Sequence, residues 1–173
     1  EYIELVNKTN KSFDLSLLRI FYQSASGSGG STLGTLSGII PPYGYWLLST
    51  NTTVTVGLTN SLAADNLIGG GFAGGSGQFV LQVTSSGAVI DALGYGSLSG
   101  GTLYEGTPAV TPSSPANSGL KRNESDDTNN NSADFTLVPV ANIDLRNSSS
   151  RLAQAGSTVA AGTYTRLVVK GNS

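Results

Sequence analysis

The chain has 173 residues, a length typical of one domain that can bury a core of its own. It contains no His and no Cys, which excludes a Ser-His-Asp triad, a Cys-His dyad, a zinc site built from imidazole or thiolate ligands and any disulfide. The net charge of −2 gives no reason to expect nucleic acid as a partner. No apolar run approaches the roughly 20 residues that a transmembrane helix needs, so we expect no transmembrane segment.

Short apolar runs with a period of two residues predict β-strands along the whole chain. In the first of them, Ile3 and Leu5 share one face. The side chain of Asp14 is placed to cap the turn before the second strand, and the Pro-Pro-Tyr-Gly sequence at residues 41–44 predicts a tight reversal. The predicted strands cover, in chain order, residues 2–6, 17–22, 33–40, 45–48, 79–83, 88–93, 135–138 and 164–169.

Helical periodicity is almost missing, because no window of twelve residues repeats convincingly every 3.6 residues. Residues 60–66 are the one stretch for which we consider a single helical turn. Strands of this length, separated by turn signals, predict an all-β sandwich or barrel. The residues predicted to form its core are Ile3, Leu5, Leu18, Ile20, Leu47, Phe79, Leu81, Val83, Ile90 and Phe135.

Eight short motifs follow one another in a characteristic order. They are EYIELVN at residues 1–7, DLS at 14–16, IPPYGYWL at 40–47, GAVIDALGYG at 87–96, EGTP at 105–108, LKRN at 120–123, DTNNNSADF at 127–135 and RNS at 146–148. Together they resemble the lamin-tail domain family in its bacterial secreted form. The resemblance covers residue 1 to about residue 150.

The resemblance implies an immunoglobulin-like β-sandwich and a module without catalytic activity. Such modules occur in nuclear lamins and in secreted or surface-anchored prokaryotic proteins, often beside nucleases or phosphoesterases. The neutral composition, with 41 Ser and Thr residues, suits a protein outside the cell. We therefore expect a structural or interaction module of a secreted or cell-surface protein. The alternative is an accessory targeting or substrate-binding domain of a secreted nuclease or phosphoesterase whose catalytic domain lies outside this chain.

Both ends of the chain depart from the family pattern. The chain begins with Glu1 and contains no Met, so we interpret it as a processed or excerpted segment. It lacks the first strand usual in the family, and we expect an open sheet edge as a result. Residues 151–162 form a linker of small residues, and residues 163–173 supply an extra strand.

The extra strand is alternating and β-branched, and we expect it to add to a sheet edge. Its apolar and aromatic residues are Tyr164, Leu167, Val168 and Val169. The edge belongs either to its own chain or to a neighbouring subunit, and the second arrangement would make a homopolymer, with the protein itself as partner. The alternative is that this strand merely begins another domain.

One loop carries the only constellation that suggests a metal. Asp126, Asp127 and Asp134 lie in an Asn-rich stretch that offers calcium several oxygen ligands. The alternative is a loop braced by Asx turns, with Asp127 and Asp134 binding backbone amides and no cofactor present. Asp91 lies in an apolar strand, where we expect backbone donors or hydroxyl groups to hold it.

Six Asn-x-Ser/Thr sequences are candidate glycosylation sites on surface loops. They begin at Asn7, Asn10, Asn51, Asn123, Asn130 and Asn147.

Overall fold

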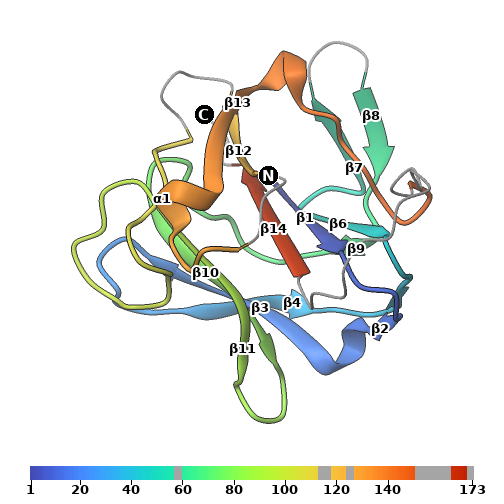
Figure 1. Ribbon diagram of the computed structural model, residues 1–173, viewed down its shortest axis with the longest axis horizontal. Helices are drawn as coiled ribbons and strands as arrows, with labels where there is room; N and C mark the ends of the chain where they lie inside the picture. Colours follow the sequence, from blue (N-terminus) through green and yellow to red (C-terminus); the bar gives the residue numbers. More distant parts are fainter. Residues whose placement is uncertain (57–59, 113–117, 124–126, 151–164, 171–173) are drawn as a thin grey trace.

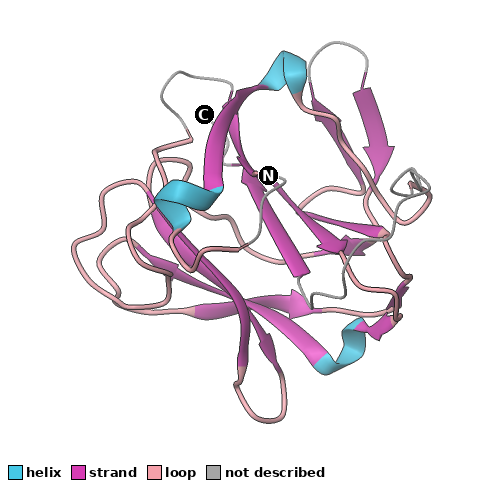
Figure 2. Ribbon diagram, viewed as in Figure 1, coloured by secondary structure: helices cyan, strands magenta, loops and turns pink. Residues whose placement is uncertain are grey.

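The computed structural model describes residues 1–56, 60–112, 118–123, 127–150 and 165–170 (Figures 1 and 2). Strands dominate this part of the chain, which confirms the all-β prediction. The three helical segments in it are single turns: η1 (Leu15–Leu17), α1 (Asn131–Asp134) and η2 (Val140–Asn142). None of the described helices is long and apolar enough to cross a membrane.

Two sheets face each other in a sandwich-like arrangement. The larger sheet has the strand order β13 (Phe135–Pro139), β12 (Ser118–Arg122), β14 (Thr165–Lys170), β1 (Tyr2–Asn7), β6 (Tyr45–Ser49) and β9 (Asn66–Leu67). The smaller sheet has the order β11 (Val89–Tyr95), β10 (Gly77–Val83), β3 (Leu18–Ser24) and β4 (Ser31–Thr35). Two short pairs complete the described strands: β2 (Phe13–Asp14) with β5 (Ile39–Ile40), and β7 (Thr53–Val56) with β8 (Asn60–Ala63).

The larger sheet is covered on both of its faces. Its inner face packs against the smaller sheet through side chains such as Ile3, Leu5 and Leu120, which meet Phe79 and Leu81 in the main core. A second cluster covers the outer face and contains Tyr2, Leu47, Val54, Val56 and Leu145. All six residues of β1 are buried as a consequence.

Eight of the ten predicted core residues are buried. Val83 is half-buried, and Ile90 is 40% exposed, so its prediction is wrong. The reason is an irregularity in the pairing of β10 with β11, where Leu81 pairs with Asp91 and Gln82 pairs with Val89. Ile90 falls between these pairs, and the extra residue breaks the alternation of faces on which the sequence prediction rested.

The helical turn considered for residues 60–66 is also wrong. Residues 60–63 form β8, which pairs with β7 from Val56↔Asn60 to Thr53↔Ala63. Residues 66–67 then form β9, the parallel edge strand beside β6. Pairing with β7, whose Thr and Val residues suit a strand, outweighs the weak local preference for a helix.

The C-terminal strand β14 lies inside the larger sheet, between β1 and β12 (Figure 1). It runs antiparallel to β1 over six residues, from Tyr2↔Lys170 to Asn7↔Thr165. On its other side it is antiparallel to β12, where Leu120 pairs with Val169. The strand predicted from the alternating sequence therefore begins at Thr165, and Tyr164 lies outside the described residues.

The core can be tested with two matched substitutions in neighbouring strands. We expect Leu81→Ala to lower the free energy of unfolding by about 2–5 kcal/mol, since it removes a fully buried side chain and leaves a cavity. Ile90→Ala should cost less than about 1 kcal/mol because the side chain is 40% exposed and lies outside the core. Urea denaturation measures both values, and equal losses would contradict the position of the β-bulge.

Candidate functional site: the Arg122 cluster and the C-terminal strand

The largest gathering of charged side chains in the described part of the chain surrounds Arg122, at the end of β12. Its guanidinium is buried and binds Asp91 of β11 through Nη2. Nη1 lies 3.1 Å from Asp127 and 3.3 Å from Asp134, and Nη2 lies 4.0 Å from Glu105. We call these five residues the Arg122 cluster. It joins one strand of the larger sheet to one strand of the smaller sheet.

Local hydrogen bonds hold the acidic side of the cluster in place. The backbone N–H and the hydroxyl of Thr128 both donate to Asp134, the hydroxyl at 2.6 Å. The N–H of Asn129 donates to Asp127 Oδ1 at 2.9 Å, as an Asx turn requires. The Asn130 side chain caps α1 by accepting from the N–H of Ser132. The described part of the loop, residues 127–134, is thus braced by an Asx turn and a helix cap.

Asn131 fastens the loop to the edge of β11, a role that the sequence analysis missed. Its Oδ1 accepts from the N–H groups of Gly94 at 2.8 Å and Glu105 at 3.1 Å. Its Nδ2 donates to the carbonyl of Ala92 at 2.8 Å and to the Glu105 carboxylate at 3.2 Å. The side chain is fully buried. Asn131 is the last of three consecutive Asn residues, and no local sequence signal distinguishes it from the two before it.

The cluster contains four carboxyl groups and only one guanidinium, so its acidic groups outnumber its basic group. Burial, reinforced by Glu105 and Asp127 and only partly offset by Arg122, raises the pKa of Asp91 to about 8. Burial and Asp127 also raise the pKa of Glu105. Burial acts in the same direction on Asp134, but the bonds from Thr128 and Asn130 outweigh it and lower the pKa of that group. The raised pKa of Asp91 favours its protonated form, which reduces the negative charge in the buried cluster.

Asp91 has a partner that the sequence prediction did not include. Backbone or hydroxyl donors were expected, and a backbone hydrogen bond at Ala92 does act on the carboxyl group. The Arg122 guanidinium, 31 residues further along the chain, binds it as well. The other carboxyl oxygen, Oδ2, is buried and has no hydrogen-bond partner among the described residues. An ionised oxygen would be costly in that position, which agrees with a raised pKa.

The calcium prediction remains untested. Asp126 lies outside the described residues, while Asp127 and Asp134 both face Arg122. Oxygen atoms of Asp91, Glu105 and Asp127 lie within 4.8 Å of one another, a spacing that suits a cation. The Arg122 guanidinium faces all three of these groups.

The predicted glycosylation sites differ in how open they are. Asn10 and Asn51 are exposed. Asn7 is only 1% exposed, and its Nδ2 donates to the carbonyl groups of Lys11 and Pro41, so the folded chain leaves no room for a glycan there. The Nδ2 atoms of Asn123 and Asn147 also donate to backbone carbonyls, and Asn130 is half-buried as the cap of α1.

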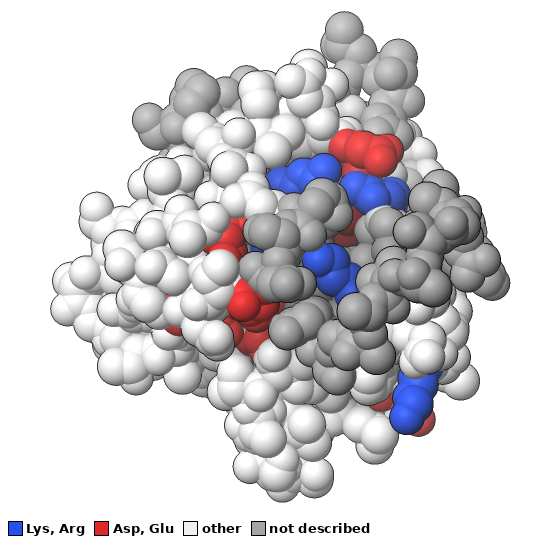
Figure 3. Space-filling view, in the orientation of Figure 1, with Lys and Arg blue, Asp and Glu red and all other residues white. Residues whose placement is uncertain are grey.

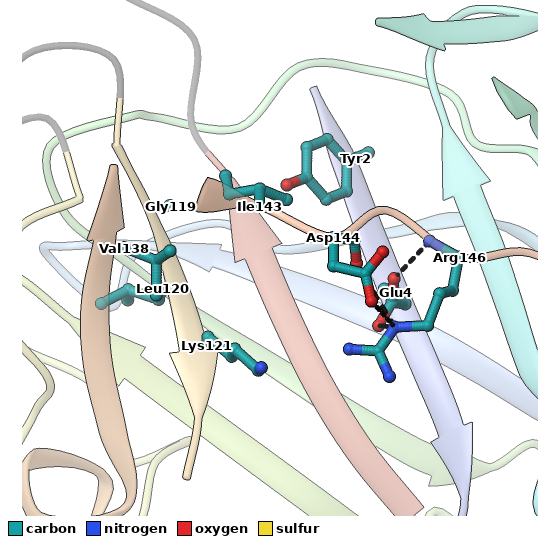
Figure 4. A pocket seen from close by; sticks show the side chains of 9 residues that line it. All are labelled: Tyr2, Glu4, Gly119, Leu120, Lys121, Val138, Ile143, Asp144 and Arg146. Carbon is teal, nitrogen blue, oxygen red and sulfur yellow. Dashed lines mark hydrogen bonds and ion pairs between the residues drawn. The ribbon is translucent and has the colours of Figure 1, made fainter. Parts of the chain in front are cut away.

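A second feature is a narrow pocket of about 20 Å³ on the outer face of the larger sheet (Figure 4). It lies across β14, with Lys121 and Gly119 of β12 on one side and Tyr2 and Glu4 of β1 on the other. Arg146 closes one end: its backbone N–H donates to Glu4 at 2.8 Å. The pocket is too small for an organic ligand, so we interpret it as a packing gap beside the inserted strand.

Comparison of the chain with protein-family models, with curated proteins and with solved structures finds no match. The lamin-tail resemblance therefore rests on the sequence motifs and stays a prediction.

The pKa of Asp91 predicts an unusual dependence of stability on pH. The folded chain keeps a proton on Asp91 up to about pH 8, whereas the unfolded chain loses it near pH 4. The stabilisation is therefore complete below pH 4 and is lost as the pH rises to 8, by at most about 1.4 kcal/mol per pH unit. We expect the free energy of unfolding to fall between pH 5 and pH 8, and to fall less steeply in Asp91→Asn. Urea denaturation at a series of pH values measures both slopes.

Asp14→Asn is the control for this measurement. Hydrogen bonds from Ser16 lower the pKa of the exposed Asp14, so this substitution should leave the slope above pH 5 unchanged. A wild-type stability that stays level or rises from pH 5 to pH 8 would contradict the raised pKa of Asp91 in the folded chain.

Proposed function

We propose that this chain is a non-catalytic structural and interaction module of a secreted or cell-surface protein, built as an immunoglobulin-like sandwich of the lamin-tail type. The observation that carries the proposal is the Arg122 cluster. Catalytic carboxylates have to face a space where substrate can bind. In the cluster, Asp91 and Asp134 are each only 1% exposed, and all four carboxyl groups face a guanidinium that belongs to the fold.

The surface also supports a structural role. Figure 3 shows one face of the molecule on which most side chains are uncharged and the acidic and basic ones gather in a few groups. Only 12% of all residues are charged. A nearly neutral surface rich in hydroxyl groups neither attracts nucleic acid nor concentrates a charged substrate.

The accessory-domain alternative has one observation in its favour. An open hollow of about 670 Å³ lies along the edge strand β13, lined by Gly96, Val110, Phe135 and other residues. The Val110 side chain is 54% exposed there. A ligand or a neighbouring domain would find apolar contacts in this hollow, whereas the hollow contains no member of the Arg122 cluster.

A comparison of turnover with stability tests the proposed function. The isolated chain should hydrolyse no nucleotide, ester, peptide or glycan substrate faster than the substrate hydrolyses in buffer alone. Arg122→Met should lower the free energy of unfolding by about 3–5 kcal/mol, because it leaves several buried carboxyl groups without their cation. Lys121→Met is the matched control on the same strand, at a half-buried position. Turnover that disappears in Asp126→Asn and Asp127→Asn would overturn the proposal.

A further inference from the structure

We propose that copies of this chain join by strand exchange, in which the slot between β1 and β12 of one copy receives residues 165–170 of a second copy. This inference rests on the proposed structural function and names the partner, which is the chain itself. The slot is the gap between β1 and β12 that β14 fills.

The slot needs an occupant whenever the sheet is intact. β1 pairs with β6 on one side and with β14 on the other, and all six of its residues are buried. Without β14, the backbone N–H and C=O groups along one side of β1 would be left without partners in a buried position. The larger sheet would also divide into a β13–β12 pair and a β1–β6–β9 group.

The register shows that the strand sequence matches the slot. Leu167 pairs with Leu5 and Val169 pairs with Ile3, and both β1 residues are fully buried in the main core. The strand thus carries apolar residues at the two positions that lie opposite core residues. Six backbone pairs and an apolar match are the features by which an added strand is recognised.

The chain between the body of the fold and β14 is longer than closure within one copy requires. Ser148 and Leu47 both donate through their backbone N–H groups to Asp65 Oδ2, which places Ser148 beside β6. From there Thr165 lies about two strand spacings across the sheet and about three residues along it, which is ~14 Å. Fourteen residues, 151–164, connect Ser150 to Thr165. At ~3.3 Å each they span up to ~46 Å.

That length also reaches a neighbour. A folded unit of about 150 residues has a radius of gyration of about 15 Å, hence a diameter of about 38 Å. The connecting segment is therefore long enough to carry its strand into the slot of an adjoining copy. Because a strand from a second copy makes the same backbone pairs, occupation from within and occupation from outside differ mainly in entropy, and the outcome depends on chain concentration.

Cysteine pairs across the register distinguish the two occupations, since the natural chain has no Cys. Val6 pairs with Arg166, and directly opposed residues of antiparallel strands lie within disulfide reach. We would mix a Val6→Cys chain with a tagged Arg166→Cys chain and oxidise the mixture at increasing concentration. Strand exchange predicts a disulfide between the two chains whose yield rises about tenfold for a tenfold increase in concentration, while both chains are dilute. The matched control mixes the Val6→Cys chain with a Val168→Cys chain, whose cysteine lies two residues out of register with position 6. This mixture should give a much lower yield of disulfide between the chains.

A truncated chain supplies an independent measurement. The chain without residues 163–173 should not assemble, and a synthetic peptide of residues 163–173 should restore its thermal stability. The same peptide, added in excess, should reduce the size of assemblies of the full chain in light scattering and electron microscopy.

Two outcomes would overturn strand exchange. One is a Val6→Cys, Arg166→Cys double variant that closes only within single chains at every concentration, together with a full chain that stays monomeric. The other is assembly that persists unchanged after residues 163–173 are deleted. Either result leaves the proposed structural function intact, because that function fails only if the chain itself turns over a substrate.

Discussion

The pairing of β1 with β14 is the constraint on which the rest of the structure depends. β1 runs through the middle of the larger sheet and is buried along its whole length. The main core lies on one face, and the second cluster, which contains Tyr2 and Leu47, lies on the other. A strand in that position has no water to satisfy its backbone, so it must be paired on both sides. β6 supplies one partner, and the other comes from the far end of the sequence.

Each wall of the slot also has contacts that do not involve the strand between them. β1 is fixed by β6 and by its core contacts, whereas β12 is fixed by β13 and by the Arg122 cluster, which ties it to β11 of the smaller sheet. The Arg122 cluster thus has a structural role in the fold, because it links a strand of each sheet. It ties the β12 wall to the smaller sheet through contacts that do not involve β14, as the proposed exchange of the occupant requires.

The sequence predicted those elements whose signal is local. Alternating apolar residues identified most of the strands, and Asp14 caps the turn at Ser16 as its position suggested. The errors have long-range causes: Ile90 is exposed because of a β-bulge against β10, and residues 60–63 are a strand because β7 lies beside them. The sequence predicted only part of the Arg122 cluster. Asp127 and Asp134 were identified as candidate ligands, but the contact between Asp91 and Arg122 was not predicted, because these residues are 31 positions apart. No local pattern joins such residues; only the packing of the two sheets does.

The length of the connecting segment reveals more about assembly than the slot does. A slot filled permanently from within needs a connection only as long as the ~14 Å gap, and four or five residues would suffice. Each doubling of a flexible loop costs only about 0.6 kcal/mol in closure entropy, so an additional nine or ten residues weaken closure within the chain only modestly. The same additional residues make the connection long enough to reach the slot of a second copy. The fourteen residues 151–164 are therefore long enough for either occupation of the slot, and under the proposed strand exchange chain concentration would select between them.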